Sequence, residues 1–209
     1  MDKLTELGMK HATDKAGYHT FTGFYSTFVD RFKDPTMIEI GIDNGGSLKM
    51  WEEYYGNPTI IGIDINDKKQ FDGKNIRTIV ADQGNVPDLV NKCISISTAY
   101  DLIVDDGSHI YSHQISCFAK LFPYVKSGGI YIVEDLHTSF IGGQYNPLNE
   151  MFTPYDFVYR VCKGLEMPET PHATEEEIDY LRNNIAEGHI YQKDPNDFLH
   201  SITSVIIKK

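Results

Sequence analysis

Acidic side chains and a histidine follow two short apolar runs in this sequence. Residues 103–109 have the sequence Ile-Val-Asp-Asp-Gly-Ser-His, and residues 132–135 have the sequence Ile-Val-Glu-Asp. We expect both runs to be adjacent strands of a parallel sheet, about 4.8 Å apart, with functional groups at their carboxyl ends. Asp106, Glu134 and Asp135 would then share one small volume. Their mutual repulsion predicts a hard divalent cation, Mg²⁺ or a similar ion, held by carboxylate oxygens.

A general base can be proposed from the same segment. His109 follows Asp106 by three residues. An alcohol held by a cation has a lowered pKa, and a neutral imidazole can remove its proton. His137 is an alternative base. His109 and His113 have the spacing of two zinc ligands on a helix, but the glutamate of the HExxH pattern is absent. In a purely structural interpretation the acids cap helices, and only Asp105 contacts a cofactor.

A glycine-rich loop lies where the first expected strand passes into the first helix. Residues 39–47 have the sequence Glu-Ile-Gly-Ile-Asp-Asn-Gly-Gly-Ser. Glycines allow a sharp turn and a close approach to a ligand. The spacing differs from the dinucleotide motif GxGxxG, and no Gly-Lys-Ser/Thr of a P-loop follows. An acidic residue beside the loop suits a ligand with an ammonium and a sulfonium group better than two phosphates. We expect Glu39, Gly41, Gly45 and Ser47 to bind this cofactor.

Polar side chains also end the next two expected strands. Asp64 ends the second strand, where a carboxylate can accept hydrogen bonds from both hydroxyls of a ribose. Asp82 and Gln83 end the third strand and are placed to meet the edge of an adenine. Each motif alone is also compatible with a turn glycine and capping acids. Because the motifs occur in the correct order, they favour a cofactor site, which we expect to include Asp105.

These residues require strands and helices that alternate along the chain. We expect strands at residues 36–41, 59–64, 76–82, 100–105, 129–134 and 204–208, and helices at residues 47–55, 86–93, 113–124, 155–165 and 175–185. Such alternation predicts an α/β fold with a doubly wound, mostly parallel seven-stranded sheet and helices on both faces. The last strand would form a C-terminal antiparallel hairpin with a partner near residues 198–202. Residues 137–154 would be a long loop, which is often functional.

The composition limits the partners of the chain. The 209 residues fit one domain, and 30 acidic against 19 basic residues give a net charge of −11. Such a charge disfavours nucleic acid. No apolar run approaches the roughly 20 residues of a membrane span, and no secretion signal is visible. The three cysteines form no CxxC pair, which favours free thiols in a reducing cytoplasm.

Taken together, these segments resemble the metal-dependent sugar O-methyltransferases of macrolide biosynthesis, of the mycinamicin and tylosin type. The resemblance covers roughly residues 7–140 and is most specific at residues 105–109 and 134–139, Asp-Asp-Gly-Ser-His and Glu-Asp-Leu-His-Thr-Ser. It also includes the glycine loop, Trp51 and residues 62–65. The N-terminal part contributes the pattern His11-x-Thr13-Asp14-Lys15 together with His19 and Tyr25.

The resemblance implies a class I, Rossmann-like methyltransferase that uses S-adenosylmethionine. It implies that Asp106, Glu134 and Asp135 hold Mg²⁺ and that His109 is the base. Lys15 and Tyr25 would join the cofactor site, with residues 1–35 covering the cofactor or the substrate and residues 36–209 forming the core.

The implied acceptor is a hydroxyl of a sugar, in a glycan or in a glycosylated natural product. The resemblance implies an added N-terminal domain in the macrolide enzymes that we do not expect in this chain, so their acceptors do not transfer to it. Alternatives are a phosphoramidate, an amine or a phenol as acceptor, hydrolysis or hydroxylation on the same scaffold, or a cofactor-binding protein without catalysis. A small-molecule partner is expected, and a homo-oligomer remains open.

Overall fold

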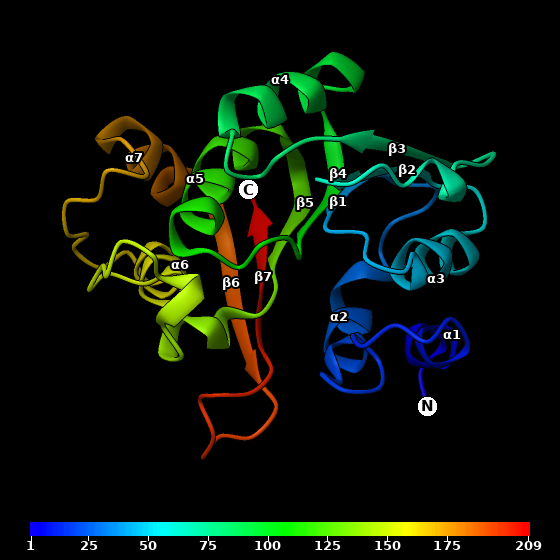
Figure 1. Cartoon of the computed structure of the whole chain (residues 1–209), viewed down its shortest axis with the longest axis horizontal. Helices are drawn as coiled ribbons and strands as arrows, with labels where there is room; N and C mark the ends of the chain where they lie inside the picture. Colours follow the sequence, from blue (N-terminus) through cyan, green and yellow to red (C-terminus); the bar gives the residue numbers. More distant parts are fainter.

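A seven-stranded sheet forms the centre of the structure, a computed structural model that describes residues 1–209 (Figure 1). The strands are β1 (Thr36–Ile40), β2 (Thr59–Asp64), β3 (Ile76–Val80), β4 (Tyr100–Asp105), β5 (Val125–Val133), β6 (Ile185–Gln192) and β7 (Ile202–Lys208). Their spatial order is β3-β2-β1-β4-β5-β7-β6. Strands β1 to β5 are parallel, and β7 runs antiparallel to both β5 and β6. The doubly wound sheet predicted from the sequence is therefore confirmed.

Helices cover both faces of this sheet. They are α1 (Lys3–Lys10), α2 (Phe21–Val29), α3 (Gly46–Tyr55), α4 (Val86–Ile96), α5 (Tyr111–Leu121), α6 (Pro154–Lys163) and α7 (Glu175–Asn184). Successive β4 residues alternate between the faces, since Leu102 packs in a core cluster with Trp51 of α3, whereas Ile103 packs with Phe118 of α5. Both faces of the sheet are buried against helices, which explains why the central strands are continuous apolar runs.

Two of the later helices begin with a reciprocal cap. Thr153 accepts from the backbone N–H of Asp156, and Thr174 does the same with Glu177, each acid bonding back to the cap residue. These capping boxes satisfy N–H groups that have no partner within the helix. None of the seven helices combines the length and the apolar character that crossing a membrane would need.

The partner of the last strand differs from the sequence prediction. Strand β7 pairs with β6, with Gln192 opposite Ile202, and not with residues 198–202. The segment between β6 and β7 forms a loop with two Asx turns. Asp194 accepts a hydrogen bond from the N–H of Asn196, and Asp197 accepts one from the N–H of Leu199. The edge strand β6 mixes polar and apolar residues and is mostly half-buried or exposed, so the sequence shows no apolar run there.

The reversal of strand order between β1 and β4 positions the functional residues. The N–H of Asp106 donates to the carbonyl of Ile40 at 2.9 Å, and the N–H of Glu134 donates to the carbonyl of Asp105 at 2.9 Å. These bonds fix the ends of β1, β4 and β5 beside one another. In open α/β sheets, ligands bind outside the carboxyl ends of the strands at such a switch point.

Candidate active site

Two cavities open at the carboxyl ends of the parallel strands. The larger one has a volume of about 390 Å³ and the smaller one about 180 Å³. Both are lined by Gly41, Asp64 and Gly107, so that they meet at the ends of β1, β2 and β4. The larger cavity is mostly polar and is closed on one side by residues 12–15 of the N-terminal segment. Its floor carries three residues predicted to do chemistry, Asp106, His109 and Asp135.

Glycines let the loops after β1 and β4 approach each other. Gly41 has φ +89°, and a Cβ at this position would lie 1.9 Å from the carbonyl oxygen of Asp106. Gly45 caps α3 with φ +74°, and its Cβ would lie 2.6 Å from the ring of Phe71. Only glycine meets both demands, a left-handed backbone and no side chain. Ser47, in the first turn of α3, lines the larger cavity.

Asp64 lies at the junction of the two cavities. One carboxylate oxygen accepts from the N–H of Ile42 at 3.1 Å, and the other accepts from the N–H of Asn66 at 2.8 Å. The ammonium of Lys68 lies 3.8 Å from the first oxygen. The carboxylate is thus held by backbone donors on two loops while it faces both cavities.

The smaller cavity is built around Gln83. Its amide nitrogen donates to Asp105 at 2.7 Å, and its oxygen accepts from the N–H of Ser108 at 2.7 Å. Ile63, Ala81 and Asp82 complete a slot that is largely apolar. Asp105 is fully buried and lines neither cavity. Burial raises the pKa of Asp105 to about 7, against the hydrogen bond from Gln83, which lowers it.

Lys15 lies among the carboxylates of Glu39, Asp106 and Glu134, which together with Asp135 form a carboxylate cluster. Its side chain is only 1% exposed, and its Nζ lies 3.0 Å from Glu134 Oε2 and 3.4 Å from Glu39 Oε1. The same ammonium contacts Asp106 Oδ2. Burial alone would lower the pKa of Lys15, but Asp106, Glu134 and Glu39 raise it well above its usual value. The ammonium therefore stays charged and ties the N-terminal segment to the ends of β1, β4 and β5.

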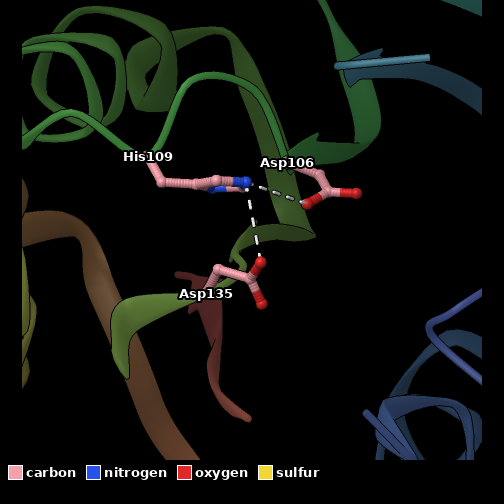
Figure 2. Close-up of side chains that lie close together, drawn as sticks. All are labelled: Asp106, His109 and Asp135. Carbon is pink, nitrogen blue, oxygen red and sulfur yellow. Dashed lines mark ion pairs between the residues drawn. The ribbon is translucent and has the colours of Figure 1, made fainter. Parts of the chain in front are cut away.

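Asp106, His109 and Asp135 converge on a second side of the cluster (Figure 2). His109 Nε2 lies 4.0 Å from Asp106 Oδ1 and 3.6 Å from Asp135 Oδ2. One ligand atom from each of the three residues lies within 4.8 Å of the other two. Of the predicted metal ligands, Asp106 and Asp135 are thus brought together with His109. Glu134, which follows β5 directly before Asp135, accepts a hydrogen bond from Lys15 through Oε2, whereas its Oε1 is buried without a partner.

Two site residues have a left-handed backbone without being glycine. His109 has φ +58° and Asp135 has φ +53°. Each such residue costs on the order of 1–3 kcal/mol and persists only where its surroundings enforce it. Here Thr138 Oγ1 donates to the carbonyl of Asp135 at 2.9 Å, and Gln114 donates to the carbonyl of Glu134 at 2.8 Å. Strain of this kind gathers at functional sites.

Three imidazoles surround Asp135. Besides His109, the Nδ1 atoms of His19 and His137 each lie 3.7 Å from Asp135 Oδ1. Burial lowers the pKa of all three histidines, that of His137 to about 4. The imidazoles are therefore neutral at neutral pH. The carboxylate cluster gains no positive charge from them.

The properties of the buried carboxyl groups fit a cation-binding site. Burial raises the pKa of Asp135 to about 8, with a further rise from the charge of Asp106, and burial raises the pKa of Glu39 to about 7. Burial also raises the pKa of Glu134 well above its usual value. Oxygens of these three residues are buried without a hydrogen-bond partner. Oxygen donors with this charge fit a hard divalent cation.

Some predicted residues lie apart from this centre. Tyr25 is fully buried, its hydroxyl lies 2.7 Å from Thr203 Oγ1, and it lines neither cavity. The Nδ1 of His113 lies 2.8 Å from Ser108 Oγ, and His113 does not belong to the group formed with His109. The contact of Lys68 with Asp64 was not predicted, because no pattern in the sequence signals it.

The sequence matches curated O-methyltransferases. It is 36% identical over 180 residues, 80% of this chain and 47% of the relative, to 8-demethyl-8-alpha-L-rhamnosyl tetracenomycin-C 2'-O-methyltransferase of Streptomyces olivaceus. It is 32% identical over 201 residues, 90% of this chain and 50% of the relative, to mycinamicin VI 2''-O-methyltransferase of Micromonospora griseorubida. The chain thus spans about half the length of these relatives. No family model matches the sequence.

Solved structures of methyltransferases also superpose on this chain. The mycinamycin-pathway methyltransferase MycE, in complex with Mg and SAH, superposes with a TM-score of 0.78 and 31% identity, covering 99% of this chain and 53% of that one. A SAM-dependent methyltransferase from Archaeoglobus fulgidus superposes over 100% of both chains with a TM-score of 0.53 and 15% identity, which shows the fold alone.

Proposed function

The chain has the class I S-adenosylmethionine-dependent methyltransferase fold and resembles the macrolide sugar O-methyltransferases, and from this premise we propose that it is itself an O-methyltransferase acting on a sugar hydroxyl. One observation carries the proposal. Asp106, His109 and Asp135 converge in the larger cavity, which adjoins the smaller one at Gly41, Asp64 and Gly107, so that donor and acceptor can meet beside one cation and one base.

The donor would span both cavities. Asp64, at their junction, is placed to accept hydrogen bonds from the ribose hydroxyls. The apolar slot beside Asp82 and Gln83 suits the adenine. The methionine part would extend along the glycine loop and Ser47 into the larger cavity, toward Asp106. Residues 1–35 would then cover the donor or the acceptor, since residues 12–15 already close one side of this cavity.

A divalent cation fits the carboxylates described above. Asp106, Glu134 and Asp135 would hold it, and Mg²⁺ is the ion that oxygen donors and the MycE complex favour. When bound, it lowers the pKa of the acceptor hydroxyl. The carboxylates place the acceptor oxygen, and the walls of the cavity limit the water that could compete with it.

His109 would take the proton of the acceptor. Its depressed pKa keeps the imidazole neutral and able to accept. As the acceptor oxygen forms its bond to the methyl carbon, the carbon–sulfur bond breaks, its electron pair stays on sulfur, and the hydroxyl proton moves to the imidazole. The products are a methyl ether and S-adenosylhomocysteine. The chain contributes orientation and charge stabilisation.

The names of the relatives support the proposed acceptor class. Their names describe methylation of mycinamicin VI, demethylmacrocin and a rhamnosylated tetracenomycin. We propose a sugar of a glycan or of a glycosylated natural product for this chain. Nucleic acid is disfavoured by the net charge of −11. The three free cysteines support a location of the protein in the reducing cytoplasm.

A panel of acceptors with donor labelled in its methyl group tests the proposal. We expect label in a methyl ether of a glycoside, loss of transfer in EDTA and recovery with Mg²⁺. Transfer only to phenols, amines or phosphoramidates would contradict the sugar acceptor while leaving the enzyme class. Tight donor binding with no transfer to any acceptor would contradict the enzyme.

A further inference from the structure

The ammonium of Lys15 and a divalent cation would need the same carboxylates. Lys15 contacts Asp106 Oδ2 and lies 3.0 Å from Glu134 Oε2. Both residues are assigned to the cation in the proposed function, on which this inference rests. The remaining oxygen of Asp106 faces His109, and the remaining oxygen of Glu134 has no partner.

We propose that Lys15 is an internal cation that competes with the divalent ion for Asp106 and Glu134, and that Glu39 receives its ammonium when the ion binds. Lys15 acts as a positioning residue. It neutralises the buried carboxylates before the ion arrives and gives them up afterwards. The N-terminal segment that closes the larger cavity is thereby coupled to occupancy of the cation site.

Electrostatics supports the competition. Even if the ion used only the remaining oxygens of Asp106 and Glu134, it would stand beside an ammonium that is 1% exposed. Like charges repel strongly at short range where water is excluded. Ion binding therefore weakens the contacts of Lys15 with these two residues, and the ammonium needs another partner.

Glu39 is the partner that the structure provides. Its Oε1 already lies 3.4 Å from Lys15 Nζ, longer than the contact with Glu134. Neither of its oxygens has a hydrogen-bond partner, and its side chain is fully buried. Glu39 lies at the end of β1 and is not among the groups that converge with His109 and Asp135. A small shift of the ammonium would thus exchange one buried carboxylate partner for another.

A double-mutant cycle on Mn²⁺ affinity tests this exchange. Mn²⁺ alone is titrated into the donor-free protein at pH 8.5, and free Mn²⁺ is followed by electron paramagnetic resonance. We expect Lys15→Met to bind Mn²⁺ at least tenfold more tightly than the natural protein, because the competitor is gone. We expect Glu39→Gln to bind it at least threefold more weakly, because Lys15 loses its second partner. In the double variant, Glu39→Gln should have no further effect.

The controls separate this inference from the proposed function. Lys10→Met removes an exposed lysine of α1 that pairs with Glu53, and we expect its Mn²⁺ affinity to stay within twofold of the natural value. Thermal melts of each variant monitor folding, and Glu39→Gln remains decisive if Lys15→Met does not fold. Unchanged or weaker binding in Lys15→Met, or unchanged binding in Glu39→Gln, would overturn the competition. No Mn²⁺ binding by the natural protein would overturn the cation site itself.

Discussion

The Nε2 atom of His109 lies 3.6 Å from Oδ2 of Asp135, across the ends of strands β4 and β5, and both residues have a left-handed backbone. Neither conformation is required by the strands themselves. The turns after β4 and β5 are thus locally strained, and this strained backbone places the imidazole and the carboxylate next to each other. A strained pair that follows the carboxyl ends of two parallel strands and lines a cavity of about 390 Å³ is the geometry expected of a reaction centre.

Replacing His109 distinguishes a base from a metal ligand. For His109→Gln we predict a fall in kcat of at least 100-fold, since a positioned base contributes roughly 10²–10⁴-fold. Mn²⁺ affinity should stay within threefold, because oxygen donors hold the ion. Steady-state kinetics and Mn²⁺ titration check both parts. The exposed His189→Gln on β6 serves as control and should be normal. A parallel loss of Mn²⁺ binding would make His109 a ligand.

Asp106→Asn should separate chemistry from donor binding. The substitution keeps the shape of the side chain but removes a charge that faces both Lys15 and His109. We predict that turnover is abolished, whereas the Kd of S-adenosylhomocysteine, measured by calorimetry, changes by only a few-fold. Near-normal turnover would exclude Asp106 from the chemistry.

Gly41→Ala should destabilise the protein by more than backbone strain alone. The new Cβ would lie 1.9 Å from the carbonyl of Asp106 at φ +89°. The matched control is Gly56→Ala, which has φ +83° and no atom within 4 Å of the new Cβ. We predict a loss of about 1–3 kcal/mol for the control, the cost of placing an L residue in a sparsely populated region of positive φ, and clearly more for Gly41→Ala, by urea denaturation. Equal losses would mean that the close approach is not required.

His137 should make stability depend on pH. Its pKa is lowered to about 4 in the folded protein, against about 6.5 when unfolded. The unfolded chain therefore binds the extra proton between pH 6.5 and 4, and stability falls as the pH falls through this window. Between pH 7.5 and 5 we predict that the natural protein loses about 2 kcal/mol more unfolding free energy than His137→Gln. Parallel losses in both proteins would contradict the assigned shift.

Local patterns in the sequence were sufficient for the sheet and its helices but not for every contact of the site. The parallel strands are apolar on both faces, so each is visible as a run, and β-sheet geometry brings Asp106 beside Asp135. Strand β6 is a half-exposed edge strand with no such run. The contact of Lys15 with Glu134 joins distant parts of the chain, and no local periodicity encodes it.

The most direct test of the central claim is a crystal structure of the protein with S-adenosylhomocysteine and Mn²⁺, with anomalous data collected at the manganese edge. We predict one strong anomalous peak bounded by the carboxylates of Asp106, Glu134 and Asp135, with His109 facing it across the larger cavity. A donor-loaded protein without a peak at these carboxylates, or with manganese bound elsewhere, would contradict it.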